Sequence, residues 1–246
     1  MRRATMAVVL IIATNFPILA ATIEKRTLSS RGKERTYSLF VPDGLSSEAP
    51  APLIITLHGS GRNGASLVEK WKSLAAKEGI ILAGPDSTVS QQWSAPEDGP
   101  VLLRDLVDTV SKVHPVDRQR VYLFGHSAGA GFALQMGLLQ SEYFAAVGIH
   151  AGAMHPDDDQ LTSFAKRKIP FAIVIGTNDS YFPLEVVRAT RDQLVKHGFE
   201  VELTELRRHT HDYYSKAASI NEGIWSFLES RSLTAEPKFV DYANMR

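Results

Sequence analysis

The chain has 246 residues, of which 44% are hydrophobic, and this suits one domain with a sizeable core. Its 27 basic and 27 acidic residues give a formal net charge of zero, which argues against nucleic acid or another strongly anionic partner. There is no cysteine, so no disulfide bond is expected to hold the fold.

The first 22 residues have the pattern of a signal peptide. Met1-Arg2-Arg3 supplies positive charge, and an apolar run from Met6 to Ala13 follows it. This run is too short to predict a stable membrane span, and cleavage is expected between Ala20 and Thr22. The pattern therefore favours a secreted or periplasmic protein. An apolar arm packed on the fold is the alternative.

Strand and helix patterns alternate along the rest of the chain after an opening hairpin. We expect strands near 23–28, 36–41, 53–57, 80–83, 121–124, 145–149, 170–176 and 200–206, and helices near 66–78, 101–114, 130–139 and 183–197, with a last helix ending near 228. This alternation predicts an α/β fold with a mostly parallel central sheet and helices on both faces. The folded domain is expected to span 23–230, followed by a loose polar tail at 231–246.

The loop after the third predicted strand is rich in glycine. His58-Gly-Ser-Gly-Arg-Asn-Gly64 holds three glycines in seven residues, which lets backbone N–H groups approach a small anion. His58 is expected to brace this loop rather than to transfer protons. A plain glycine-rich connection between a strand and a helix is the alternative interpretation.

The most informative motif is Gly125-His126-Ser127-Ala128-Gly129, which lies between a predicted strand and a predicted helix. A serine at such a tight turn is held in a strained conformation, and glycines two residues to either side avoid steric clashes. Ser127 is therefore the candidate nucleophile. The amides of Ser60 and Ala128 are the expected donors of an oxyanion hole.

A serine nucleophile of this kind is followed along the chain first by an acid and then by a histidine. Asp179 comes directly after the buried strand at 170–176, where ligands gather in open α/β sheets. A role confined to ordering its own turn is the alternative. Two histidines follow the last strand. His211 is favoured as the catalytic base, and His209 remains the competing candidate.

Other motifs of known chemistry are absent from the sequence. No G-x-x-x-x-G-K-[ST] phosphate loop and no G-x-G-x-x-G dinucleotide motif occurs. There is also no H-E-x-x-H motif, and His209 and His211 share one short loop without distant partners that would complete a zinc site. We expect neither a cofactor nor a metal.

The segment at 153–168, between the sixth and seventh predicted strands, is short. It leaves little room for an inserted lid, which favours a minimal lid and an open cleft. Trp93 and the pair Tyr181-Phe182 lie on loops at the same end of the sheet as Ser127 and are candidates for an aromatic substrate wall. Packing beneath a long loop is the alternative for Trp93. His126 is expected to point into the fold or toward the wall of the pocket.

These motifs together resemble the α/β-hydrolase superfamily. The segments that carry the resemblance are Leu57-His-Gly-Ser-Gly61, Gly125-His-Ser-Ala-Gly129, Gly176-Thr-Asn-Asp179 and His209-Thr-His-Asp-Tyr213. Within it, the chain is most similar to small secreted esterases grouped with polyhydroxybutyrate depolymerases and with feruloyl or acetylxylan esterases. It departs from them in having Arg207-Arg208 before the histidine loop and no cysteine.

The resemblance implies an α/β-hydrolase catalytic domain and a serine esterase that works through a Ser-His-Asp triad and an acyl-enzyme. Its substrate would be a small-molecule or polymer-linked ester. A peptidase or amidase, an acyltransferase, and a non-catalytic binding relative are the alternatives. The sequence leaves the acyl and alcohol specificity and the oligomeric state open.

Overall fold

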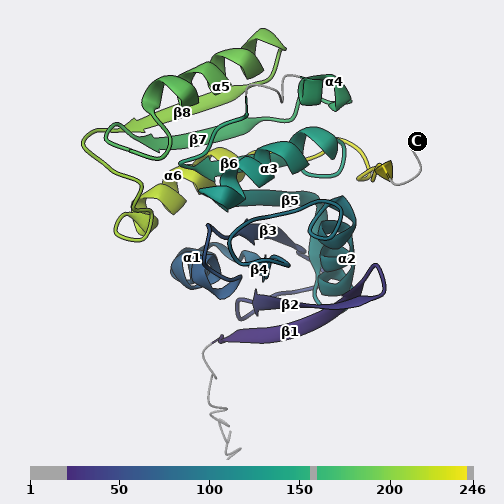
Figure 1. Ribbon diagram of the computed structural model, residues 1–246. Coiled ribbons are helices and arrows are strands. Elements are labelled where there is room, and N and C mark those ends of the chain that lie inside the picture. Colours follow the sequence, from purple (N-terminus) through teal and green to yellow (C-terminus); the bar gives the residue numbers. More distant parts are fainter. Residues whose placement is uncertain (1–20, 156–159, 243–246) are drawn as a thin grey trace, which may run out of the picture.

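The computed structural model describes residues 21–155 and 160–242. A single eight-stranded sheet runs through this part of the chain in the order β1-β2-β4-β3-β5-β6-β7-β8, and Figure 1 shows the strands stacked in this order. The strands are β1 (Ile23–Ser30), β2 (Lys33–Phe40), β3 (Ala51–Leu57), β4 (Ile81–Pro85), β5 (Val116–His126), β6 (Ala146–His150), β7 (Phe171–Gly176) and β8 (Val201–Leu206).

Six of these strands run parallel to one another. β1 and β2 form the expected antiparallel hairpin, and β2 also pairs antiparallel with β4. From β4 to β8 every neighbouring pair is parallel, with Leu53 opposite Val121 and Gly125 opposite Ile149. The carboxyl ends of β3, β5, β6, β7 and β8 therefore meet at one edge of the sheet, where loops from distant parts of the sequence come together.

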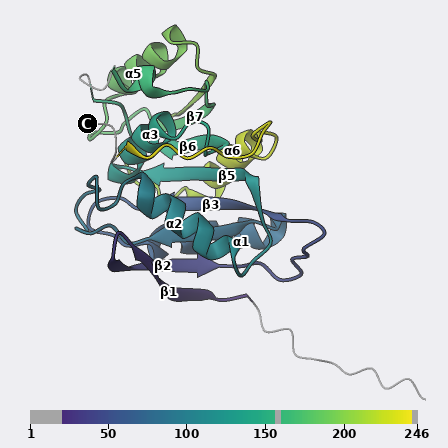
Figure 2. The same ribbon diagram turned by 90° about the vertical axis from the view of Figure 1, so that its right-hand side faces the viewer.

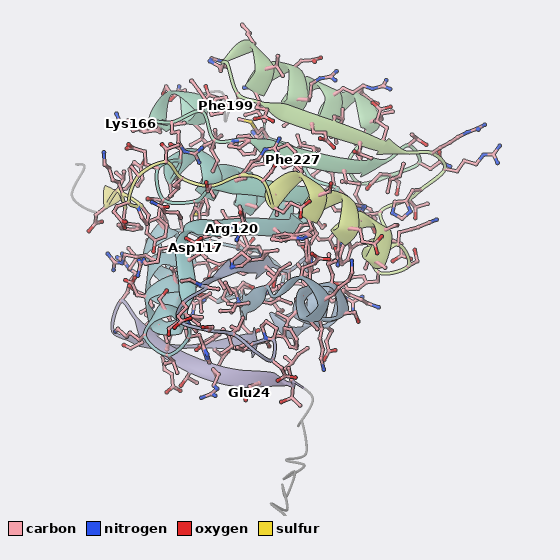
Figure 3. The ribbon with its side chains drawn as sticks, turned by 180° about the vertical axis from the view of Figure 1, so that it is seen from behind. Glu24, Asp117, Arg120, Lys166, Phe199 and Phe227 are labelled. Carbon is pink, nitrogen blue, oxygen red and sulfur yellow. The ribbon has the colours of Figure 1, made fainter. Side chains whose placement is uncertain are left out.

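Helices cover both faces of the sheet, as the alternating pattern predicts. The helices are α1 (Ala65–Glu78), α2 (Pro100–Ser111), α3 (Ala128–Leu139), α4 (Leu161–Phe164), α5 (Leu184–Lys196) and α6 (Ala217–Leu228). Buried side chains of α2, α3 and α5 form one core cluster with the sheet, and those of α1 and α6 form the other. Figure 2 shows α2 on one side, and Figure 3 shows α6 with Phe227 crossing the other.

Burial explains why these strands have nearly continuous apolar sequences. Every residue of β3, β4, β6 and β7 is buried, because helices exclude water from both faces of the central strands. The edge strand β8 alternates between exposed and half-buried residues, since only one of its faces is covered. Sequence alternation and position in the sheet therefore agree strand by strand.

Three features differ from the sequence-based expectation. The strand that leads into Ser127, β5, begins at Val116 rather than near 121. The apolar run predicts only its second half, because the first half carries charged, half-buried residues. The helix expected to reach His114 ends at Ser111. The short helix α4 (Leu161–Phe164) within the segment 153–168 was not predicted.

The segment predicted as a loose polar tail is fastened to the fold over its described residues, 231–242. The N–H of Leu233 donates to the carbonyl of Gln119 at 2.9 Å. Farther along, the buried side chain of Gln140 accepts from Val240 N–H at 3.0 Å and donates to its carbonyl at 2.7 Å. These bonds join residues about a hundred positions apart, and no local pattern signals them.

The predicted signal peptide lies almost wholly in residues 1–20, which are outside the described part of the chain. Within the described residues, no helix is both long enough and apolar enough to cross a membrane.

Candidate active site

The turn between β5 and α3 has the strained geometry expected of a nucleophile elbow. Ser127 has φ 57° and ψ −119°, a conformation that L-residues rarely adopt. Close packing requires glycine on both sides. A Cβ on Gly125 would lie 2.2 Å from the carbonyl oxygen of Gly129, and one on Gly129 would lie 1.9 Å from that of Leu57. The turn therefore holds Ser127 at the carboxyl edge of the sheet.

Ser127, His211 and Asp179 are joined by a row of hydrogen bonds. His211 Nε2 lies 2.9 Å from Ser127 Oγ, and His211 Nδ1 lies 2.8 Å from Asp179 Oδ2. Because an ionised carboxylate only accepts, Nδ1 carries the proton and Nε2 is left to accept from the serine hydroxyl. Three residues from separate loops thus take the arrangement in which a serine is activated.

The loops that carry Asp179 and His211 are fixed to each other and to the sheet. The N–H of Asn178 donates to the carbonyl of His209 at 2.8 Å. Asp179 is buried, and its second oxygen, Oδ1, accepts from the N–H groups of Tyr181 and Phe182 at 2.8 and 2.9 Å. Both carboxylate oxygens are therefore engaged, which fixes the plane in which His211 is held.

The two competing histidines have different partners. His211 contacts Ser127, whereas His209 is 7% exposed and packs with its ring centroid 5.5 Å from that of His150. Nε2 of His209 is buried and has no hydrogen-bond partner among the residues that the structure describes. The geometry therefore favours His211 for the base.

His150 is a member of the site that the sequence analysis missed. It ends β6, and its Nδ1 lies 3.1 Å from Nδ1 of His126, so one of these nitrogens donates and the other accepts. The ring of His126 lies in turn 5.1 Å from that of His211. The signal was its position, since His150 follows a buried apolar strand whose carboxyl end must lie beside that of β5.

Burial keeps these inner histidines neutral. It lowers the pKa of His126 to about 4, with a smaller effect from the nearby His211. Burial also lowers the pKa of His150 to about 2, helped by His126 and the other neighbouring histidines. No group of three or more His, Cys, Asp or Glu within the described residues is arranged to hold a metal ion.

The glycine-rich loop lies beside the nucleophile. Ser60 and Ser127 line the same cleft, and Ala128 directly follows the nucleophile at the first position of α3. In the described part of the chain, the N–H groups of Ser60 and Ala128 donate no hydrogen bond to another protein group. The two amides expected to form the oxyanion hole can therefore donate to a bound substrate.

His58 and Trp93 support this loop from behind. His58 Nδ1 donates to the carbonyl of Gly59 at 2.9 Å, while Nε2 accepts from the N–H of Ser87 at 3.2 Å, as expected of a bracing residue. Trp93 Nε1 donates to the carbonyl of His58 at 2.8 Å, and its ring stacks on Phe132 at 5.2 Å. Trp93 does not line the cleft, so its position fits packing beneath a loop and corrects its placement in a substrate wall.

The cleft above Ser127 has a volume of about 570 Å³ and is open. Tyr181 lines it with 75% of its surface exposed and its ring 4.7 Å from that of His211. His126 also lines the cleft, which is one of the two orientations predicted for it. Phe182 stacks on His211 at 5.9 Å but is not part of the cleft wall.

Comparison with known proteins identifies the family. The sequence profile described as Esterase PHB depolymerase matches residues 35–166, which are more than half of the chain. The chain belongs to this esterase family. The matched region includes the glycine-rich loop and the nucleophile elbow, while Asp179 and His211 follow it.

Individual relatives of this esterase family member agree with the assignment. NocK of Nocardia uniformis subsp. tsuyamanensis is 30% identical over 187 residues, which cover 69% of this chain and 52% of NocK. A poly(3-hydroxybutyrate) depolymerase of Ralstonia pickettii is 28% identical over 123 residues, covering 41% of this chain and 25% of that protein. The chain thus spans about half or less of the length of these relatives.

A solved structure gives the fold. The ferulic acid esterase AmCE1/Fae1A of Anaeromyces mucronatus superposes with a TM-score of 0.68 at 20% sequence identity, covering 85% of this chain and 91% of that one. The strand order, the elbow after β5 and the helices on both faces are thus those of the α/β-hydrolase fold. The fold class and the family resemblance predicted from the sequence are confirmed.

Proposed function

We propose that this chain is a serine esterase that hydrolyses carboxylic esters through an acyl-enzyme on Ser127. The observation that carries the proposal is the continuous row of hydrogen bonds from Ser127 through His211 to Asp179. Membership of an esterase family supports it independently. The open cleft and the named relatives suit a small-molecule ester or one linked to a polymer.

In the proposed reaction, Ser127 Oγ attacks the ester carbonyl while His211 Nε2 takes its proton. Asp179 keeps His211 oriented and stabilises the imidazolium that forms. The amides of Ser60 and Ala128 hold the oxyanion of the tetrahedral intermediate. His211 then gives the proton to the leaving alcohol. A water molecule, deprotonated by the same histidine, attacks the acyl group and releases the acid.

The test is a rate assay of the purified protein on p-nitrophenyl esters from acetate to octanoate and on methyl ferulate. Ser127→Ala should lower turnover by at least about a thousandfold, because the covalent step is lost. The unfolding temperature of this variant should stay at or above that of the wild type, because alanine removes only the hydroxyl oxygen and adds no atom to the tightly packed turn. Activity retained in this variant, or hydrolysis of anilides with none of esters, would contradict the proposal.

A further inference from the structure

Arg62 brings a positive charge into the cleft beside the candidate oxyanion hole. It lies on the loop between β3 and α1, two residues after Ser60, and it is exposed and lines the cleft. Among the cleft-lining residues that the structure describes, it is the one lysine or arginine. A charge at this position lies within reach of a substrate bound at Ser127.

The guanidinium of Arg62 is held by an aromatic ring rather than by a carboxylate. Its Cζ lies 4.8 Å from the ring centroid of Tyr214, which also lines the cleft, and Lys70 Nζ lies 5.9 Å from the same centroid. Over the described residues, neither cation has a carboxylate oxygen within ion-pair distance. Two uncompensated cations thus share one ring.

The one carboxylate among the described residues that line the cleft does not neutralise this pair. Asp212 also lines the cleft, but its Oδ1 accepts from the N–H of Tyr214 at 3.1 Å, and it makes no ion pair with Arg62. The pKa of Asp212 is lowered, mainly by a hydrogen bond from Ser215, so the carboxylate is ionised. Its hydrogen bonds are made to residues of its own turn. The guanidinium of Arg62 remains available to an anion from solution.

The ring of Tyr214 contacts both Arg62 and the residue that precedes the nucleophile. Tyr214 meets His126 edge to face at 5.9 Å, and His126 directly precedes Ser127. A planar guanidinium that is stacked on a ring is already oriented, so it loses little freedom on binding. Its fork of N–H groups matches the two oxygens of a carboxylate.

We propose that Arg62 binds a carboxylate carried by the substrate, so that this cleft selects esters with an anionic group near the scissile bond over neutral esters of the same size. This inference rests on the proposed ester hydrolysis at Ser127. The Tyr214 ring positions the guanidinium, and Lys70 adds to the positive potential on the same side of the cleft.

The test uses two pairs of esters that differ in charge and are matched in shape. 4-Acetoxybenzoate and 4-acetoxybenzamide place the charge on the alcohol side, and monophenyl adipate and the phenyl ester of adipic monoamide place it on the acyl side. The kcat/KM of each is measured for the wild type, Arg62→Gln and Arg62→Lys. Arg207→Gln is the matched control, because it removes an exposed arginine that does not line the cleft.

In at least one pair, Arg62→Gln should lower kcat/KM for the anionic ester about tenfold more than for its neutral partner. Arg62→Lys should recover part of the difference, and Arg207→Gln should keep the wild-type ratio. Raising the ionic strength should weaken the wild-type preference for the anionic ester. Comparing each substrate with itself across variants cancels its intrinsic reactivity.

Equal losses for the charged and neutral members of both pairs would overturn this inference while leaving ester hydrolysis intact. The same holds if Arg62→Gln, shown by its unfolding transition to be folded, keeps the wild-type ratio in both pairs. Absence of Ser127-dependent turnover on every ester would instead overturn the proposed function, and this inference with it.

Discussion

His209 and His211 stand two residues apart in one loop, yet their surroundings give them different chemistry. A histidine that acts as a base needs an acceptor that fixes its tautomer and a reacting proton at its other nitrogen. His211 has both, from Asp179 and from Ser127. His209 has a buried Nε2 that finds no hydrogen-bond partner in the described part of the chain, and it packs against His150. Side-chain direction, and not position in the sequence, separates the two.

Glutamine substitutions of these two histidines form a matched pair. His211→Gln should lower kcat on an ester substrate by about a thousandfold or more, because glutamine accepts no proton from Ser127. His209→Gln should keep the greater part of the activity, since its ring does not reach the nucleophile. Steady-state rates of both variants on p-nitrophenyl butyrate measure this. The opposite ranking would transfer the base to His209.

Most of the residues brought together at this edge of the sheet could be named from the sequence. Ser127 and Asp179 follow buried strands in short, recognisable motifs, and chain order alone relates them. His150 was missed because its strand end carries no motif. Its contact with His126 depends on β5 and β6 being neighbours, and this is a fact of sheet order.

At the scale of elements, the glycine-rich loop at 58–64 is held in place by the loop that follows β4. Gly61 N–H donates to the carbonyl of Ser90 at 2.8 Å, and Gly64 N–H donates to Asp86 Oδ1 at 2.7 Å. Trp93 Nε1 adds a bond to the carbonyl of His58. The loop at 86–99 therefore acts as a support. Sequence periodicity revealed both loops but not their contact, because it reports only on local structure.

Removing the indole N–H of Trp93 should weaken this support. Trp93→Phe loses one hydrogen bond to the glycine-rich loop, which contributes about 0.5–1.5 kcal/mol. If this bond positions the proposed oxyanion donors, kcat should fall about two- to tenfold with little change in KM. Trp225→Phe, the same substitution on α6 at a side chain that does not line the cleft, should affect stability but not kcat. Ester kinetics and urea unfolding of both variants measure this. Wild-type kcat in Trp93→Phe would show that the bond does not position the oxyanion donors.

The limits of the predicted elements follow the same physics. Strands buried on both faces were placed within a residue or two, because their apolar runs are continuous. The polar composition of the C-terminal segment gave no sign of its hydrogen bonds to Gln140. The first half of β5 was missed because its charged residues lie at a register shift between two pairings with β3, Val116 with Ala51 and Val121 with Leu53.

At the scale of the whole molecule, the carboxyl edge of the sheet gathers four histidines from β5, β6 and the loop after β8. His126, His150 and His209 pack in a row behind His211, and the buried Tyr213 covers the first two at 5.3 and 5.6 Å. Asp179 and Asp212 are carboxylates near this row, and Lys216 is a cation that acts on His209. Burial lowers the pKa of the three inner histidines, His126, His150 and His209, so the fold favours their neutral forms and its stability depends on pH.

The sign of this dependence follows from the direction of the pKa shifts. The pKa of His150 falls from 6.5 in the unfolded chain to about 2 in the fold, so below pH 6.5 only the unfolded chain gains the proton. The stability tied to this group is complete above pH 6.5 and is lost as the pH falls. Between about pH 7.5 and about pH 5 the loss for this one group is about 2 kcal/mol.

His150→Gln should therefore lose about 2 kcal/mol less unfolding free energy than the wild type over the same pH interval, whatever its stability at neutral pH. Urea unfolding at both pH values measures the difference, and carboxylates elsewhere cancel because both proteins contain them. If His150→Gln instead kept the wild-type pH dependence, the imidazole of His150 would have to take up its proton within the fold, and burial would not hold this histidine neutral.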